Sequence, residues 1–449
     1  MNAIQGFFSS VTRRKALRPL ALAMAAGLAC SAQAATYYVD ANNTRASDSN
    51  AGTVAAPWKT ITKAATTMVG GDTAVVRAGN YGAVSTVRAG SGGNRITFLA
   101  AGAVNTGGWT IGHDYVTVKG FKLTNAEITI KNANQCEVLN NEIVAGSISW
   151  STLAVSSGCL IKGNHLHGAV SPDGDWPQIN IFGTNHLVES NEIGPASDID
   201  AFRIFGSNHV LRGNYVHDIT YSPNSRAHMD MFQTFGDNGW VSNNIVIENN
   251  RFINSQGQLF NTSQDGVSGI HDYVVRNNVF ANISQNANVG LPNFYFYNNT
   301  LYNTGIIYQV TGGPGQPFNG SNLVVKNNLL IGLAGCENRD FDNVFNNPSS
   351  LPMTRAYNYY ANCAGQALTN FRSETGGVNG GAVNLISPGS YNFGITSPSV
   401  AIKTGTPLNF SYDLLGAPRP AGSAWDKGAY QFVTTSATSL LPPTKLTAR

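Results

Sequence analysis

One short pattern of apolar and polar positions recurs along the middle of the chain. In each copy an Asn has an apolar residue three positions before it and another two positions after it, and the slot directly before it holds only Asn, Gly or Ser. Asn, Gly and Ser are favoured where the backbone turns through a left-handed conformation. Each copy therefore predicts a strand, a tight corner and a second strand. The eight corner residues are Asn141, Asn164, Asn191, Asn214, Asn250, Asn278, Asn299 and Asn328.

The spacing of these copies predicts a solenoid. The corner residues lie 21 to 36 residues apart, and no 3.6-residue helical pattern runs between them. Such a unit is typical of one coil of a right-handed parallel β-helix, in which coils stack about 4.8 Å apart and equivalent side chains form ladders. Cys136 and Cys159 should then be neighbours on adjacent coils, and so should His186 and His209 as structural residues. A β-sandwich is the alternative fold, but irregular spacing around one constant corner disfavours it.

The two ends of such a stack should be covered, because unpaired strand edges would otherwise be exposed. Residues 58–69 predict a short helix that caps the first coil, and the Pro/Gly-rich residues 397–432 predict a closing cap. We expect a single β-helix domain over residues 35–433, followed by a flexible tail at 434–449.

Residues 1–34 have the three parts of an export signal. Basic residues occupy 13–18, an apolar run covers 20–29, and Ala32-Gln33-Ala34 suits cleavage before Ala35. The apolar run is too short to span a bilayer, and no other stretch approaches about 20 apolar residues, so we expect no membrane insertion. The sequence predicts a secreted or periplasmic protein, by either the general or the twin-arginine route.

Composition and net charge limit the classes of molecule that the chain is expected to bind. The chain is 12% charged and 42% hydrophobic, which excludes a disordered protein, and its net charge of +3 depends on the basic residues of the export signal. A nearly neutral mature chain without Lys/Arg runs gives no support to nucleic-acid binding, and we expect a monomer. The four cysteines that follow the export signal lack the spacing of a zinc site. They predict two disulfides or two buried thiol pairs, Cys136/Cys159 and Cys336/Cys363.

Both ends of the chain carry more specific motifs. Near the start these are Tyr37-Tyr-Val-Asp-Ala-Asn42, Pro57-Trp-Lys-Thr-Ile61 and Val76-Arg-Ala-Gly-Asn-Tyr81, and near the end Gly416-Ala-Pro-Arg-Pro420 and Trp425-Asp-Lys-Gly-Ala-Tyr430. With the repeats, they resemble secreted right-handed β-helix proteins of the pectate-lyase-like superfamily. The resemblance implies the fold, secretion and action on polysaccharides. It does not choose among lyases, glycoside hydrolases, uronate C5-epimerases and noncatalytic modules.

Aligning the coils gathers ionisable residues on one outer face. Arg203 aligns with Gln233, Asp200 with Asp230, and Asp198 with His228. Strand pairing alone does not require such a cluster, so we interpret it as the candidate site, although caps on loop backbone would be an alternative role for these side chains. The expected catalytic residues are Asp200, Arg203, Arg226, His228 and Asp230. The expected substrate-binding residues are Trp176, Asn180, Tyr221, Gln233 and Asn261.

The residue types favour elimination on an acidic polysaccharide. A uronate carboxylate must be neutralised before the neighbouring proton can be removed, and Arg203, Arg226 or a Ca²⁺ ion held by Asp198, Asp200 and Asp230 would do so. His228 or Tyr221 would act as base or acid, and Asp230 would orient His228 or join the metal site. The leading hypothesis is therefore an enzyme, a polysaccharide lyase that cleaves a uronate-containing polymer.

Three alternatives stay open. A glycoside hydrolase would use Asp200 and Asp230 as its two carboxylates, and one coil of separation is nearer the about 5 Å of retaining enzymes. A uronate C5-epimerase would begin with the same proton abstraction as a lyase. A noncatalytic carbohydrate-binding module would stack Trp176, Tyr221 and Trp240 on sugar rings.

Overall fold

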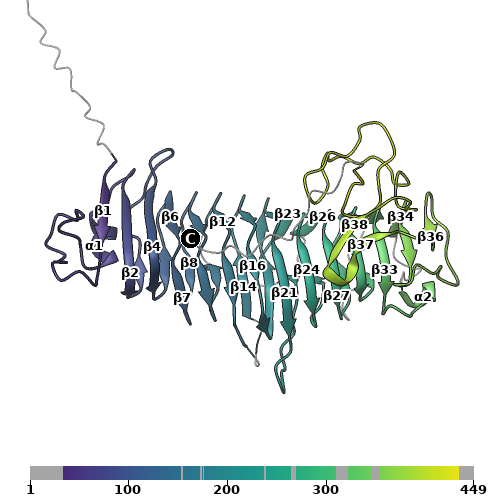
Figure 1. Cartoon of the computed structure of the whole chain (residues 1–449), viewed down its shortest axis with the longest axis horizontal. Coiled ribbons are helices and arrows are strands. Elements are labelled where there is room, and N and C mark those ends of the chain that lie inside the picture. Colours follow the sequence, from purple (N-terminus) through teal and green to yellow (C-terminus); the bar gives the residue numbers. More distant parts are fainter. Residues whose placement is uncertain are drawn as a thin grey trace, which may run out of the picture. The chain divides into compact units, whose positions relative to one another are not determined.

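Parallel strands of successive coils stack into a right-handed parallel β-helix within residues 34–433 (Figure 1). The computed structural model describes residues 34–152, 155–171, 174, 176–236, 239–263, 269–309, 322–344 and 353–433. The predicted export signal, except Ala34, and the predicted tail lie outside the described residues. The predicted fold is confirmed. No helix of the described residues is long and apolar enough to cross a membrane.

Ten strands stack in parallel to form the face that carries the candidate site. They are β3 (Val84–Ser85), β5 (Trp109–Ile111), β8 (Ile128–Ile130), β11 (Ile148–Trp150), β14 (Trp176–Ile181), β18 (Ile199–Ile204), β22 (Phe232–Thr234), β25 (Phe260–Ser263), β28 (Ala287–Gly290) and β31 (Ile307–Gln309). Each strand belongs to a different coil, so neighbours in this sheet are distant in sequence. We call it the site sheet.

The larger sheet has 26 strands and forms two further rows of each coil. It opens with β1 (Thr36–Val39), β2 (Thr73–Tyr81) and β4 (Ile96–Thr106). One row contains β6 (Val116–Lys119), β9 (Glu137–Leu139), β12 (Leu160–Lys162), β15 (Leu187–Glu189), β20 (Val210–Arg212), β23 (Ser242–Glu248), β26 (Ile270–Arg276), β29 (Phe294–Tyr297), β32 (Leu323–Lys326) and β34 (Met353–Ala356). β19 (Gly206–Ser207) also pairs with β23.

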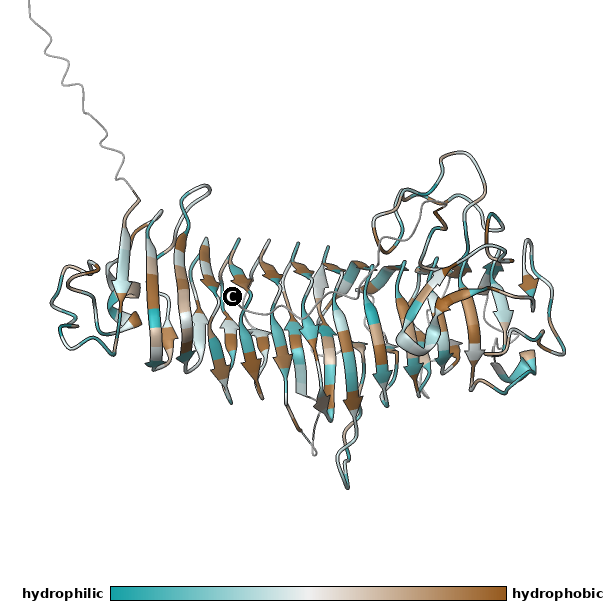
Figure 2. Cartoon of the chain, in the orientation of Figure 1, coloured by the Kyte–Doolittle hydropathy of each residue, from teal (hydrophilic) through white to brown (hydrophobic). Residues whose placement is uncertain are grey.

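The other row contains β7 (Lys122–Thr124), β10 (Glu142–Val144), β13 (His165–His167), β16 (Glu192–Ile193), β21 (Tyr215–Thr220), β24 (Arg251–Ser255), β27 (Val279–Ile283), β30 (Thr300–Thr304), β33 (Leu329–Leu333), β35 (Tyr359–Ala361) and β36 (Val378–Asn379). β17 (Ala196–Ser197) pairs with β21. Figure 2 shows brown and teal bands along these strands, the alternation that directs apolar side chains inward.

The predicted corner asparagines form one continuous buried ladder between the two rows. The Asn250 side chain is typical: its oxygen accepts the backbone and side-chain N–H groups of Asn214 at 2.8 and 2.9 Å, and its nitrogen donates to Leu211 O and Asn278 Oδ1 at 2.9 and 3.0 Å. The residue before each corner adopts the left-handed conformation that the sequence predicts, as Asn249 does at φ 58°. The ladder extends one rung further than predicted, to Asn358, and ends on the Glu374 carboxylate.

The predicted neighbours on adjacent coils are confirmed. Disulfides join Cys136 to Cys159 and Cys336 to Cys363. The imidazoles of His186 and His209 stack in parallel with centroids 5.0 Å apart, and each ring accepts a backbone N–H from the coil before it. Burial lowers the pKa of His186 to about 3 and that of His209 to about 4, so both are neutral structural residues.

The N-terminal cap is a helix, but a shorter one than predicted. Helix α1 (Ile61–Thr67) begins after Thr60, whose side-chain oxygen accepts the Lys63 N–H at 3.1 Å, and it buries Ile61, Ala64 and Ala65 against the first coils. Trp58 lies outside the helix, where an Asn50 carbonyl accepts its indole N–H. The cap thus starts only where a side chain can satisfy the first backbone N–H groups.

The predicted C-terminal cap lies along the side of the stack rather than across its end. The hairpin of β37 (Leu385–Ser387) and β38 (Asn392–Ile395), with the short helix η1 (Pro388–Ser390), precedes this segment. The Arg419 guanidinium donates to Asn277 Oδ1, the Ala429 N–H to Thr300 Oγ1, and Lys427 Nζ to Gly376 O. Figure 1 shows this yellow segment beside the last coils. The segment covers the outer corner of several coils. A cap confined to the last coil would leave those corners exposed to water.

Candidate functional site

The sequence alignment of the site sheet is confirmed by its strand register. Asn180 pairs with Arg203, Arg203 with Gln233, Gln233 with Asn261, and Asn261 with Asn288. These five side chains form one polar column across β14, β18, β22, β25 and β28. Consecutive strands are one coil apart, so the column runs along the helix axis.

A second polar column begins three residues before the first. Asp200 lies beneath Asp230, whose backbone N–H donates to Asp200 Oδ1 at 2.9 Å, and Asp230 in turn bridges to Gln258 on the next coil. Residues three apart on a regular strand point to opposite faces. The Arg203 guanidinium nevertheless reaches the Asp200 carboxylate in β18, so the two columns meet through these side chains.

The carboxylates of Asp200 and Asp230 are both completely buried. The Arg203 guanidinium donates to Asp200 Oδ2 at 2.6 Å and stacks over the Phe235 ring at 5.8 Å. Burial raises the pKa of Asp200 to about 7, the nearby Asp230 charge adds to this, and Arg203 opposes it. Two adjacent buried carboxyls resist ionising together. Near neutral pH, Asp200 therefore exchanges between a neutral acid and the anion that pairs with Arg203.

His228 presents an exposed imidazole next to this buried pair. Its Nδ1 lies 3.1 Å from Asp230 Oδ2, and the side chain is 48% exposed whereas that of Asp230 is buried. Gln258 Nε2 lies 3.0 Å from His228 Nε2 and can only donate. The two contacts together favour the tautomer with its proton on Nδ1, in which the lone pair of Nε2 accepts the Gln258 N–H.

The structure does not bring every predicted residue into this cluster. Asp198 adopts a left-handed conformation, φ 58°, and its carboxylate accepts the Ser222 N–H at 3.1 and 3.3 Å. Its predicted place beside His228 is therefore wrong, and it serves as the loop cap that was the alternative. Arg226 is exposed on the loop at 221–227, and no ion pair within the described residues joins it to Asp200 or Asp230.

Tyr221 lies at the start of the same loop. Its N–H donates to Gln256 Oε1 at 2.7 Å, and its hydroxyl accepts from Gln285 Nε2 at 2.9 Å. Both contacts hold it to the next coils rather than to the carboxylate pair. Tyr221 thus fixes the loop that leads to His228.

The three predicted Ca²⁺ ligands do not fit a shared metal site. The Asp198 carboxylate binds loop N–H groups, and the two oxygens of Asp200 accept from Arg203 and from the Asp230 N–H. A cation there would compete with the Arg203 charge. Among the residues that the structure describes, no three His, Cys, Asp or Glu side chains are arranged to hold a metal ion.

Aromatic side chains form a wall on one side of the polar columns. Phe182 stacks on Phe205, and Trp240 packs edge-on against both rings at 5.2 and 4.8 Å. Trp240, predicted as a possible sugar platform, is therefore engaged in packing. Trp176 is 44% exposed at the start of β14 and lines a pocket of about 310 Å³ with Glu127. Trp176 can thus still meet a ligand.

Two polar residues of the cluster were missed in the sequence. Gln258 contacts His228, and Asn288 donates to Gln258 Oε1 at 2.9 Å. Aligning Leu259-Phe260-Asn261 with Met231-Phe232-Gln233 would have placed Gln258 over Asp230. The repeat therefore contains a signal for Gln258, which stands three residues before Asn261 just as Asp230 stands three residues before Gln233.

The fold has known counterparts among solved structures. No family model and no curated protein sequence matches the chain. A structure of XylC in complex with xylose matches with a TM-score of 0.62 at 12% identity, over 89% of this chain and 98% of that one. The pectate lyase Pel9A matches with a TM-score of 0.52 at 16% identity, over 89% and 96%. The chain thus shares the parallel β-helix fold with both of these structures.

Proposed function

We propose that the chain is a polysaccharide lyase that cleaves an acidic, uronate-containing polymer by β-elimination. The observation that carries the proposal is the exposed His228 imidazole, oriented by the buried Asp230, whose backbone N–H binds the Asp200 carboxylate that pairs with Arg203. The fold of the chain, shared with the pectate lyase Pel9A, supports action on such a polymer.

The residues account for the proton and charge balance of an elimination. Arg203 pairs with the sugar carboxylate and makes the neighbouring C5–H more acidic. The substrate displaces the Gln258 amide from His228 Nε2. His228 Nε2 then removes that proton, a C4–C5 double bond forms, and the C4–O bond breaks. The imidazolium then returns its proton to the departing oxygen, so one residue serves as base and acid. Asp230 stabilises the imidazolium that exists between the two steps.

The hydrolase alternative receives less support from the geometry. Two carboxyl groups must reach the glycosidic bond in a hydrolase, but the side chains of Asp200 and Asp230 are both completely buried. The epimerase alternative shares the His228 chemistry and differs only in returning the proton to C5. A noncatalytic module would give no role to the exposed His228 imidazole oriented by the buried Asp230.

The test is product formation from a panel of acidic and neutral glycans. We expect absorbance near 235 nm to rise together with reducing ends on a uronate polymer, and His228→Asn to lower that rate at least a hundredfold with an unchanged Tm. His271→Asn is a matched control, since His271 also contacts its Asp272 through Nδ1, at 2.7 Å, outside the site.

Other products would identify the alternatives. Reducing ends without absorbance would show a hydrolase, and solvent proton exchange at constant chain length an epimerase. Activity measured with and without EDTA tests whether Ca²⁺ is needed. We expect full activity in EDTA because the carboxylates of Asp198 and Asp200 already accept hydrogen bonds from the protein.

We also propose that the protein works outside the cytoplasm. Two disulfides in one chain are typical of oxidising compartments. Fractionation of cells expressing the full chain should place the protein in the periplasm or medium, starting at Ala35.

A further inference from the structure

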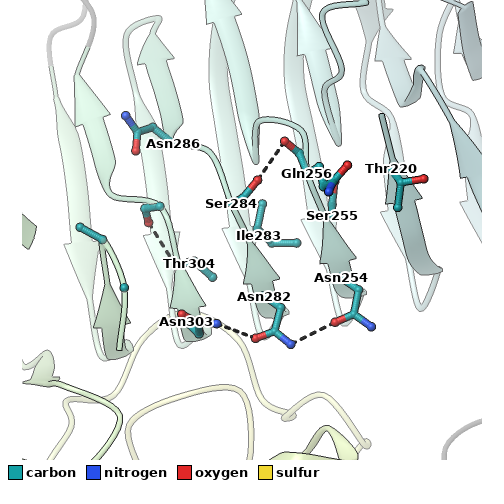
Figure 3. A pocket seen from close by; sticks show the side chains of 13 residues that line it. Thr220, Asn254, Ser255, Gln256, Asn282, Ile283, Ser284, Asn286, Asn303 and Thr304 are labelled. Carbon is teal, nitrogen blue, oxygen red and sulfur yellow. Dashed lines mark hydrogen bonds between the residues drawn. The ribbon is translucent and has the colours of Figure 1, made fainter. Parts of the chain in front are cut away.

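A pocket separate from the charged cluster lies at the end of β24, β27, β30 and β33. It has a volume of about 650 Å³, and its lining residues come from five successive coils, since Thr220 of β21 also lines it (Figure 3). Four coil steps of about 4.8 Å give it a length of about 19 Å along the axis. None of the residues that line it belongs to the Asp200–Asp230–His228 cluster.

The floor of the pocket is a second, outer row of amides. Asn303 Nδ2 donates to Asn282 Oδ1 at 2.9 Å, and Asn282 Nδ2 donates to Asn254 Oδ1 at 3.0 Å (Figure 3). A primary amide offers two N–H groups and two acceptor lone pairs. The row uses one N–H and one lone pair of Asn282, so the same amide can also donate to and accept from a ligand.

The lining has no charge. All its described residues are neutral, and hydroxyl and amide groups of Ser284, Asn286 and Gln256 stand at its exposed rim. A carboxylate in this pocket would meet no cation, whereas a sugar hydroxyl both donates and accepts and suits an amide row. The chemistry therefore selects neutral sugar units over uronates.

The pocket is connected to the loop that leads to His228. Thr220 lines the pocket, and the next residue, Tyr221, is held by Gln256 and Gln285. Gln256 is itself a lining residue. A glycan in the pocket therefore lies against the anchor of the 221–227 loop.

We infer that this pocket is a second carbohydrate site, which binds neutral sugar units of the polymer or of its branches. The inference deepens the proposed function, since it makes the substrate a polysaccharide of mixed neutral and acidic composition. Binding at the pocket nevertheless needs no elimination chemistry, so the two can be tested separately.

The experiment is calorimetric titration of the full chain with xylotriose, mannotriose and galactotriose, and with trigalacturonate for comparison. We expect at least one neutral trisaccharide to bind, with an affinity that rising salt does not change. Ser284→Trp and Ala334→Trp place bulk into the pocket from two exposed positions and should each weaken binding at least tenfold. Val87→Trp, at an exposed position far away in sequence, is the matched control and should bind normally.

The outcomes separate the two proposals. If no neutral trisaccharide binds, or if binding survives both bulky substitutions in variants with normal Tm, the pocket inference is overturned even where His228-dependent elimination is intact. If neutral sugars bind and both substitutions abolish it, the inference stands even if no glycan of the panel is cleaved. If the two bulky substitutions weakened only the binding of trigalacturonate, that result would also contradict the inference of a neutral-sugar site.

Discussion

The ionisation of the Asp200 carboxyl changes the net charge around Arg203, in a site where the described residues include no lysine. Its carboxyl lies between the Arg203 guanidinium and the Asp230 backbone N–H, and burial raises its pKa to about 7. Protonation of Asp200 removes one negative charge next to the Arg203 guanidinium, which favours the approach of a substrate carboxylate. Ionisation of Asp200 restores that charge and weakens the attraction.

A prediction at the residue scale concerns Asp200→Asn. A carboxyl that ionises near pH 3.9 in the unfolded chain but near 7 in the folded one stabilises the fold fully below pH 3.9 and loses that contribution as the pH rises through 7. In Asp200→Asn this loss should disappear. Urea unfolding from pH 4 to 8 should show a free energy of unfolding that falls less with pH in the variant than in the wild type.

The same substitution has a kinetic consequence. We expect the alkaline limb of the activity profile to flatten in Asp200→Asn, since no negative charge appears at this position beside Arg203 as the pH rises. His271→Asn should leave both profiles unchanged. An identical pH dependence in wild type and Asp200→Asn would contradict the raised pKa.

At the scale of the structural element, the asparagine corner explains why so much could be predicted. A corner needs a left-handed residue followed by an Asn that satisfies backbone groups on two coils, and few residue types meet both conditions. The pattern is therefore strict, and it located eight rungs and the site-sheet register. The ninth rung, Asn358, was missed because Arg355 stands where the other copies have an apolar residue. The Arg355 guanidinium pairs with the Glu374 carboxylate at 3.8 Å.

Positions that depend on loop geometry were less predictable. Asp198 looks in the sequence like a member of the column that holds His228, but its left-handed backbone turns it toward Ser222. The contact between Arg203 and Asp200, three residues apart in one strand, also has no sequence signal of its own. Side-chain direction near the start of a strand depends on how the preceding loop meets the sheet, whereas ladder positions depend only on repetition.

The ladder makes its own prediction. Asn250→Ala removes two donated and two accepted hydrogen bonds at a fully buried site and leaves buried partners unsatisfied, so we expect a loss of about 2–4 kcal/mol in the free energy of unfolding. Asn244→Gly is the control, because Asn244 is an exposed corner at φ 56° and glycine keeps that conformation. Equal urea midpoints for the two variants would show that the buried rung is not required.

At the scale of the whole molecule, stacking makes residues distant in sequence into neighbours, and two disulfides reinforce that stacking at separate coils. Cys136 and Cys159 are 23 residues apart, and Cys336 and Cys363 are 27 apart. Each joins adjacent coils. The stack should therefore be weaker at both places when the thiols are reduced.

The corresponding prediction is a reduction experiment. Closing loops of this length stabilises a protein by about 3 kcal/mol each, so dithiothreitol should lower Tm by several degrees. Cys136→Ser/Cys159→Ser should reproduce part of that shift and respond less to the reductant. A Tm unaffected by reduction, with thiol titration confirming two opened bonds, would rule out a stabilising role.

The ladder that ends at Glu374 also has a polarity. Every rung accepts from the coil before it and donates to the coil after it, so the amide dipoles point the same way from Asn141 to Asn358. Aligned dipoles leave partial positive charge at the last N–H groups, as at the start of an α-helix. Glu374 places its anionic oxygen there, at 2.8 and 3.0 Å from the Asn358 donors, and so terminates the array as an acidic residue terminates a helix macrodipole.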